Sequence, residues 1–207
     1  MAGVREEKKR RTRKAILRAA VRLFGDEGYE RTSIAALARA AGVGKGTIYN
    51  YFQTKSEIFL AFCEDELDHV YAEVAEKSRA DASLIEQLTS LFLAEFRYVT
   101  RHKDFGRLLL REMIFPKELT VERSKDLDNR YLDYLSVMCR KAQERGELRR
   151  DVDLLFVCGH FYALYLMSVS AWYMGRLQTE DDVAEALRLL LQQAMNGLLP
   201  SDTNEHW

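Results

Sequence analysis

Apolar residues recur at intervals of three and four along most of this chain, the spacing that places them on one face of an α-helix. Glycine or proline follows several of these stretches, although only two prolines occur in 207 residues. The pattern predicts an all-α protein of about nine helices. The expected helices cover about residues 6–27, 33–41, 45–52, 54–79, 83–99, 105–114, 118–145, 154–174 and 179–198.

Several predicted helices begin at residues that suit a helix start. Ser33 is expected to cap the second helix, because its hydroxyl can accept a backbone N–H of the first turn. Thr54 with Glu57, and Ser83 with Glu86, have the spacing of a capping box. These residues place the starts of the second, fourth and fifth helices.

Residues 32–55, TSIAALARAAGVGKGTIYNYFQTK, predict two short helices joined by a turn that begins at Gly42. The first helix has an apolar stripe with helical spacing. The second has little to bury beyond Val43 and Ile48, and it otherwise carries hydrogen-bond donors and aromatic hydroxyls. We therefore expect the second helix to face a partner rather than a core.

Residues 154–174 contain no Asp, Glu, Lys or Arg over 21 positions. This length and composition would suit a membrane-spanning helix. However, Gly159, His160 and aromatic rings with polar atoms are spread along the stretch rather than gathered at its ends. We expect instead a helix that is buried on nearly every side, as in a dimer interface, and no membrane.

The formal net charge of −1 conceals an uneven distribution. Residues 1–55 hold 13 Lys and Arg against 5 Asp and Glu, whereas residues 56–207 hold 18 against 27. A concentrated positive charge of this kind is typical of a nucleic-acid-binding segment, although a solvated basic tail is the simpler alternative.

The chain offers no set of residues typical of catalysis, cofactor binding or metal binding. Cys63, Cys139 and Cys158 are far apart in the sequence and lack a C-x-x-C spacing, so we expect three buried thiols in a reducing compartment. A nucleophile elbow, a phosphate-binding glycine loop and paired histidines on one helix face are all absent from the sequence. We expect neither enzyme activity nor a cofactor nor a metal.

The window from Thr32 to Lys55 resembles the DNA-binding domain of the TetR/AcrR family of bacterial transcriptional regulators. The pattern is T-S-I-x-x-L-A-x-x-A-G-V-x-x-G-T-I-Y-x-Y-F-x-x-K, without a gap. The resemblance implies a three-helix helix-turn-helix domain over residues 1–54, a helical bundle for ligand binding and dimerisation over 55–200, and a polar tail at 201–207.

The resemblance also implies which residues meet DNA. In a helix-turn-helix the second helix enters the major groove. Lys45 and Thr47 would reach bases or phosphates, and Tyr49 and Lys55 match positions that usually grip phosphates. Gly44 departs from the family, which often has Ser or Thr there. The full set of expected DNA-binding residues is Ser33, Ala35, Lys45, Gly46, Thr47, Tyr49, Asn50, Tyr51 and Lys55.

A ligand pocket in the C-terminal part is likewise implied by the family. For every candidate side chain, packing in the core is the alternative role. The candidate lining residues are Phe92, Phe96, Phe105, Met113, Tyr131, Tyr134, Met138, Phe161, Tyr165 and Trp172. Polar groups that could orient a ligand are His102, Arg111, Glu112 and His160.

Taken with the resemblance, the sequence predicts a cytoplasmic, nucleoid-associated bacterial repressor. It is expected to bind a palindromic double-stranded operator as a homodimer that pairs through its last two helices. A small, hydrophobic effector would release it from DNA. The alternative is a DNA-bound protein of the same fold whose C-terminal domain holds a protein partner.

Overall fold

The computed structural model describes the whole chain except residues 1, 78, 80, 101–102, 117 and 197–207. Within this part the regular elements are nine α-helices and one 3-10 turn, with no strand. The all-α prediction is therefore confirmed.

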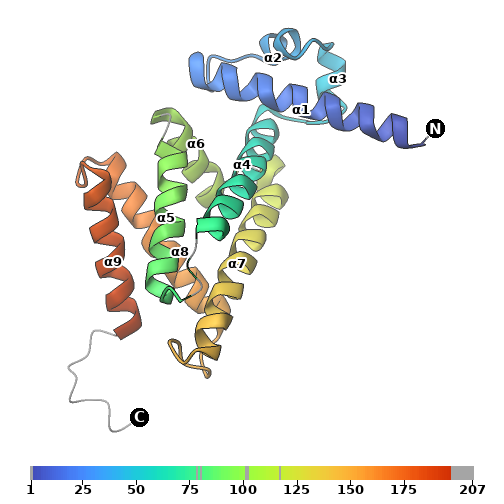
Figure 1. Cartoon of the computed structure of the whole chain (residues 1–207). Coiled ribbons are helices and arrows are strands. Elements are labelled where there is room, and N and C mark those ends of the chain that lie inside the picture. Colours follow the sequence, from blue (N-terminus) through green and yellow to red (C-terminus); the bar gives the residue numbers. More distant parts are fainter. Residues whose placement is uncertain (1, 78, 80, 101–102, 117, 197–207) are drawn as a thin grey trace. The chain divides into compact units, whose positions relative to one another are not determined.

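Figure 1 shows the helices in chain order. Their bounds are α1 Ala2–Asp26, α2 Ile34–Ala41, α3 Lys45–Tyr49, α4 Lys55–Lys77, α5 Leu84–Thr100, α6 Lys103–Ile114, α7 Val121–Glu144, α8 Leu154–Tyr173 and α9 Glu180–Asn196. The 3-10 turn, η1, covers Glu118–Thr120.

Several elements differ from their predicted bounds: α1 begins at Ala2 rather than at about residue 6, and α6 begins at Lys103 rather than at 105. The helix expected over 45–52 ends at Tyr49, and the next residues form turns in which Tyr51 and Phe52 both donate their backbone N–H to Ile48. The helix expected from residue 118 begins at Val121, after η1. Thr120 ends that turn, where its side chain is buried and donates to Glu112 Oε2 at 3.3 Å.

The chain divides into two compact units. The first comprises residues 1–71 and 97–128, and the second comprises residues 72–96 and 129–207. The first unit thus includes α6 and most of α4 in addition to the three N-terminal helices.

The core of the first unit forms where α1 packs against α2 and α2 against α3. Apolar residues at helical spacing on α1, such as Ile16, Ala20 and Phe24, are buried, as are Leu37 on α2 and Ile48 on α3. Burying a large apolar side chain stabilises a fold by about 1.5–3 kcal/mol. This shared core fixes the direction in which the short α3 presents its other residues.

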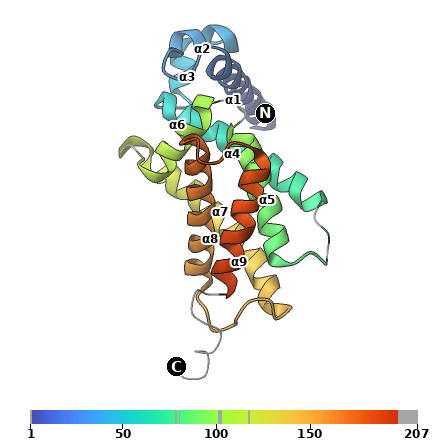
Figure 2. The same ribbon diagram turned by 90° about the vertical axis from the view of Figure 1, so that its left-hand side faces the viewer.

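The second unit contains α8 and α9, which lie side by side and are joined by a short connection (Figure 2). Phe161, Tyr165 and Val169 of α8 are buried, and so are Val183 and Leu187 of α9. Thr179 and Asp182 cap the start of α9: Asp182 N–H donates to Thr179 Oγ1 at 3.1 Å, and Thr179 N–H donates back to Asp182 Oδ2 at 2.8 Å.

The single chain does not bury residues 154–174 on nearly every side, and their burial in a dimer interface stays a prediction. Leu155, Phe156 and Met167 of α8 are 60%, 75% and 61% exposed. By length and composition alone α8 is also apolar enough to cross a membrane. The described part of the chain covers one face of α8 and leaves a second apolar face in contact with solvent.

Candidate nucleic-acid interface and ligand-binding residues

The start and end of α2 are fixed by the two residues that the sequence indicates. Ser33 Oγ accepts the backbone N–H of Ala36 at 3.1 Å, which satisfies one of the orphan donors of the first turn. Gly42 has a φ of +68°, and its N–H bonds back to the carbonyl of Arg39. A side chain is strained at that φ, so glycine ends α2 there.

The short α3 presents nearly all of its surface. Ile48 is its one fully buried residue, whereas Lys45, Gly46 and Tyr49 are exposed, Tyr49 by 55%. Asn50, directly after the helix, is exposed as well. A helix with a single apolar anchor and an exposed row of donors is suited to lie against a polar partner.

The remaining expected DNA-binding residues flank this surface. Ser33 is exposed, and Ala35, Thr47 and Tyr51 are half-buried. The structure therefore places eight of the nine expected residues on the outside of α2, α3 or the turns next to them.

Gly44 does not have an unusual backbone conformation. It lies before α3 with φ −76° and ψ 154°, which is extended backbone open to any residue, and no side chain caps the helix there. A Cβ at Gly44 would lie 3.9 Å from Thr47 Oγ1, an ordinary contact distance. The turn therefore has the shape that the usual Ser or Thr would also allow.

Lys55, the ninth residue, donates to backbone carbonyls rather than standing free in solvent. Its Nζ lies 2.7 Å from the carbonyl oxygen of Tyr29, 3.3 Å from that of Glu30 and 3.1 Å from that of Thr32. Nζ also lies 4.2 Å from the centre of the Tyr29 ring. An ammonium group has three donors, and these three carbonyls can accept all of them.

Tyr29 joins the same loop to α4. Its hydroxyl lies 2.9 Å from Ser56 Oγ, and its ring contacts Phe24 and Phe59 at 5.1 and 5.8 Å between ring centres. Burial raises the pKa of the Tyr29 hydroxyl. Together Lys55 and Tyr29 hold the loop between α1 and α2 against the start of α4.

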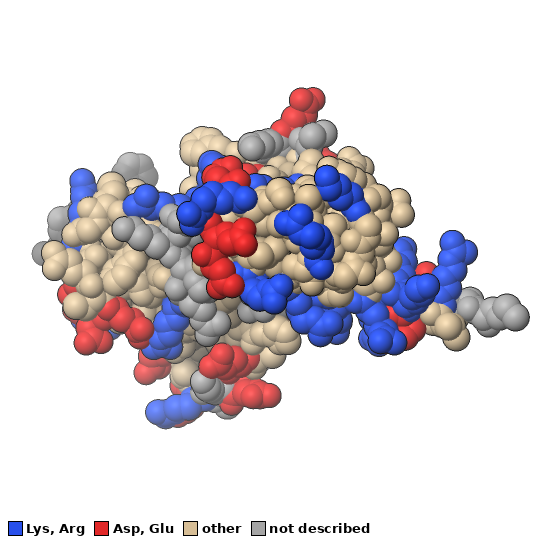
Figure 3. Space-filling model, turned by 90° about the horizontal axis from the view of Figure 1, so that it is seen from above, with Lys and Arg blue, Asp and Glu red and all other residues tan. Residues whose placement is uncertain are grey.

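Positive charge in the first unit is concentrated on α1. In Figure 3 blue side chains gather toward the end of the molecule where α1 begins. The exposed basic residues of this helix are Arg5, Lys8, Lys9, Arg10, Arg11, Lys14, Arg18 and Arg22. A row of exposed cations attracts a phosphate backbone without regard to its sequence.

Comparison with known proteins identifies the family. Residues 16–62 match the model of the bacterial regulatory proteins of the tetR family, and residues 85–196 match that of the tetracyclin repressor-like C-terminal domain. The chain belongs to the tetR family of transcriptional regulators.

Curated relatives of this tetR-family chain include two repressors that align along nearly their whole length. The HTH-type transcriptional repressor NicS of Pseudomonas putida is 27% identical, over 95% of this chain and 96% of NicS. The HTH-type transcriptional repressor KstR2 of Mycolicibacterium smegmatis is 25% identical, over 94% of each chain.

A solved structure with a similar fold is that of FadR from Thermus thermophilus, a TetR-family repressor in complex with lauroyl-CoA. It has a TM-score of 0.77 and 26% identity, and the match covers 94% of this chain and 99% of FadR. Members of the family thus include regulators with a bound small molecule.

The candidate pocket residues of this regulator fall into three groups. Phe92, Phe96, Tyr131, Phe161 and Tyr165 are buried in the second unit. Tyr134, Met138 and Trp172 are half-buried in the same unit, and Met113 is half-buried on α6 of the first unit. Phe105 lies outside the described side chains.

Several of these rings are in contact with one another. Phe92 stacks on Tyr165 with 5.0 Å between ring centres, and Phe96 meets Trp172 edge-on at 5.1 Å. Tyr131 lies 4.6 Å from Tyr162, a residue that the sequence analysis did not include. The second unit thus brings aromatic residues of α5, α7 and α8 into one cluster.

The sequence analysis also missed a buried carboxyl group next to this cluster. Glu95 is 2% exposed, and its Oε2 accepts a hydrogen bond from the Tyr131 hydroxyl at 3.0 Å. Burial raises its pKa to about 8. The signal was present in the sequence, because Glu95 interrupts the apolar stripe between Phe92 and Phe96.

Of the polar candidates, Arg111 and Glu112 bind each other and their surroundings. Arg111 NH2 lies 3.4 Å from Glu112 Oε1 and 3.8 Å from Glu30 Oε1. His160 is exposed, and His102 lies outside the described residues.

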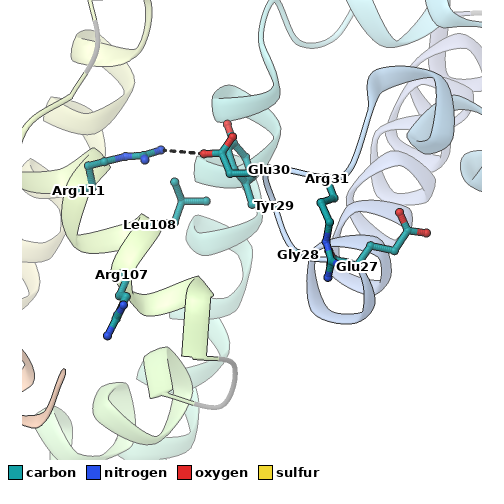
Figure 4. A pocket seen from close by; sticks show the side chains of 8 residues that line it. All are labelled: Glu27, Gly28, Tyr29, Glu30, Arg31, Arg107, Leu108 and Arg111. Carbon is teal, nitrogen blue, oxygen red and sulfur yellow. Dashed lines mark hydrogen bonds and ion pairs between the residues drawn. The ribbon is translucent and has the colours of Figure 1, made fainter. Parts of the chain in front are cut away.

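An open recess of about 450 Å³ lies in the first unit beside Arg111. Figure 4 shows it between the loop that follows α1 and the helix α6. Its lining residues are Glu27, Gly28, Tyr29, Glu30, Arg31, Arg107, Leu108 and Arg111. None of the ten predicted pocket residues lines this recess.

The three cysteines are buried free thiols, as the sequence predicts. Cys139 and Cys158, far apart in the sequence, have their sulfurs 3.8 Å apart. Across the residues that the structure describes, no cluster of three His, Cys, Asp or Glu could hold a metal ion.

Proposed function

We propose that this tetR-family regulator represses transcription by binding a palindromic DNA operator as a homodimer. The observation that carries the proposal is the exposure of α3, which buries Ile48 alone and leaves Lys45, Gly46 and Tyr49 open. A recognition helix presents its N-terminal residues to base edges in the major groove, and this surface has the donors for that task.

The roles we propose for the DNA-binding residues follow their exposure. Lys45, Gly46, Thr47 and Asn50 would approach bases, and Tyr49 would contact a phosphate. The flanking residues Ser33, Ala35 and Tyr51 would lie along the backbone. For Lys55 we propose a positioning role, because its ammonium already donates to the carbonyls of residues 29, 30 and 32.

Selection of bound duplexes from a random DNA pool tests this proposal. We expect enrichment of an inverted repeat whose half-sites lie about one helical turn apart, because two symmetry-related α3 helices would read it. A Lys45→Ala, Tyr49→Ala double variant should enrich nothing. Enrichment of the same repeat by that variant would contradict the assignment of α3.

We further propose that α8 and α9 pair with the same helices of a second copy. The apolar face of α8 that includes Leu155, Phe156 and Met167 is exposed, and no other helix of the second unit lies in front of α8 and α9 in Figure 2. Monomers seldom leave so large an apolar face in water.

Sedimentation of a Phe156→Asp, Met167→Asp variant tests the dimer. Two buried, unpaired carboxylates in each copy would oppose association, so we expect this variant to sediment as a monomer. Asp in place of the exposed Val4 of α1 serves as the control and should leave the dimer intact. If the double variant is still a dimer, the interface lies on a surface other than this face of α8.

We propose that a small molecule bound in the second unit releases the operator. Support comes from the aromatic cluster of that unit and from the related FadR, a repressor of similar fold that has a small molecule bound. Helix α4 is one continuous helix whose residues belong to both units, so it can carry a change between them. The ligand must bind the DNA-free conformation more tightly, because equal affinity shifts no equilibrium. The protein would act in the cytoplasm, by binding rather than by catalysis.

A further inference from the structure

In the described part of the chain, the second unit buries the carboxyl group of Glu95 without giving both of its oxygens a hydrogen-bond partner. Glu95 Oε2 accepts the Tyr131 hydroxyl, but Oε1 has no hydrogen-bond partner among the described residues. A buried polar atom without a partner costs about 1–3 kcal/mol, which an apolar residue of similar size would avoid. Buried polar groups without a partner are rare in native proteins, and functional sites are one place where they are expected.

A series of aromatic rings in contact begins at Tyr131, whose hydroxyl donates to this carboxyl. The Tyr131 ring lies 4.6 Å from that of Tyr162, and Tyr162 lies 6.4 Å from Tyr165, which stacks on Phe92 at an angle of 17°. Ring faces carry a partial negative charge. A carboxylate and several ring faces in one dry region together attract positive charge.

We propose that Glu95 and these rings form the effector subsite, and that the effector is an organic cation carrying apolar groups. The inference rests on the proposed function and deepens it by naming the class of ligand. A hydrocarbon chain would leave Oε1 unpaired, and an anion would be repelled. A cation pairs with the carboxylate while its apolar groups are buried against the rings.

Entry of such a ligand requires the rings around Glu95 to separate. The ligand-bound conformation therefore differs from the closed one, and the ligand favours it through contacts that the closed state lacks. This is the differential affinity that a ligand needs in order to shift the protein away from its DNA-bound form.

Protonation adds a measurable consequence. Burial raises the pKa of Glu95 to about 8, so the carboxyl is mostly protonated at neutral pH. Among the described residues, the Tyr131 hydroxyl donates to this carboxyl, and Tyr134 of the same helix has its pKa raised by burial and then by the charge of Glu95. A cation that binds the carboxylate must expel the proton, close to one per cation at about pH 7.

The test compares two ions of the same shape and opposite charge. Tetraphenylphosphonium and tetraphenylborate are titrated into the full-length protein by calorimetry in buffers of different ionisation enthalpy, with benzyltrimethylammonium as a smaller cation. Glu95→Gln removes the charge and preserves the shape. Glu144→Gln, which removes an exposed carboxylate from α7, is the matched control.

We expect at least one of the cations to bind the wild type and the Glu144→Gln variant at least about tenfold more tightly than Glu95→Gln, with proton release only where Glu95 is present. Tetraphenylborate should bind the wild type more weakly than tetraphenylphosphonium. The proposal is overturned if Glu95→Gln binds the cations within about twofold of the wild type, if the anion binds as tightly as the cation of its shape, or if neither cation binds at about 1 mM.

Operator binding without any probe separates this inference from the proposed function. Glu95→Gln should bind selected DNA within about twofold of the wild type, because the carboxyl belongs to the second unit. Failure of the wild type to bind either cation, while it still binds selected DNA, overturns the subsite alone. Failure of the wild type to select any DNA overturns the regulator itself.

Discussion

Two ionisable side chains, Lys55 in the first unit and Glu95 in the second, differ in how completely they are hydrogen-bonded. The Lys55 ammonium donates to three backbone carbonyls, so each of its N–H groups has an acceptor. The buried Glu95 carboxyl has a donor for Oε2 and none among the described residues for Oε1. Lys55 thus has its hydrogen-bond partners within its own unit, whereas Glu95 leaves one oxygen for the proposed ligand to pair with.

This difference in hydrogen bonding fits a rigid first unit and a second unit that changes conformation. A DNA-reading surface has to be held in place, and Lys55 does this by tying residues 29–32 to the start of α4. A regulatory unit has to change when its ligand binds, and a group that is incompletely paired in the closed state gives the ligand something to gain.

The largest effect is expected from the pH dependence of stability. The pKa of Glu95 is raised from 4.5 to about 8 on folding, so the folded state binds the proton more tightly. The stability that this proton provides is complete below the unfolded pKa and is lost as pH rises through about 8, by about 3–5 kcal/mol. Glu95→Gln should remove this loss. Urea unfolding of both proteins at about pH 5 and about pH 9 measures it, because other groups cancel in the difference.

If the stabilities of the wild type and Glu95→Gln fell in parallel with rising pH, Glu95 would be ionised in the folded state and adequately paired. Its contrast with Lys55 would then disappear. Glu144→Gln, which alters an exposed carboxylate, should follow the wild type.

The next effect concerns Lys55 itself. Lys55→Met leaves three carbonyls without this donor and should lower the free energy of unfolding by about 2–3 kcal/mol. The exposed Lys45, changed to Met in the same way, should alter stability by less than about 0.5 kcal/mol. Thermal and urea unfolding measure the stabilities of the two variants against the wild type. Unchanged stability of Lys55→Met with a weaker salt dependence of DNA binding would assign Lys55 to a phosphate.

A smaller effect is expected at the cap of α2. Ser33→Ala removes the acceptor for the Ala36 N–H and should cost about 1 kcal/mol, whereas Ser33→Gly should cost only a few tenths. Equal losses in the two variants, measured by urea unfolding, would mean that the hydroxyl does not stabilise the helix start.

The smallest effect is expected for the ion pair between Arg111 and Glu30. The two charges lie 3.8 Å apart and are well exposed, so a double-mutant cycle should give a coupling below about 0.5 kcal/mol that vanishes in salt. A coupling above about 2 kcal/mol would show that surface charges rival the buried ones in this protein.

The short-range features of the fold were predictable from the sequence. Ser33, Gly42, Thr179 and Asp182 act at helix ends through atoms a few residues away, and local chemistry alone determines such contacts. The end of α3 at Tyr49 could not be predicted from the sequence, because the turns after it depend on the burial of Phe52 in the core of the first unit.

Contacts between segments that are far apart in the sequence could not be predicted from it. Lys55 meets carbonyls more than 20 positions away, and Glu95 meets Tyr131 across 36 positions. The family resemblance indicated a phosphate contact for Lys55, and the pattern of apolar residues did not identify Glu95 as a candidate. Periodicity assigns a residue to a face of its helix but does not say which side chain of another helix it meets.

The most direct test of the central claim, that α3 reads DNA, is the salt dependence of operator affinity. Fluorescence anisotropy of a selected operator gives Kd at several salt concentrations for the wild type, Lys45→Ala and Lys141→Ala, an exposed lysine of the second unit. The account predicts that Lys45→Ala weakens binding by at least about tenfold and changes the slope of log K against log salt by up to about 1, or relaxes the preferred sequence at one position. Lys141→Ala should match the wild type. Identical affinity, slope and sequence preference for Lys45→Ala and the wild type would contradict the account.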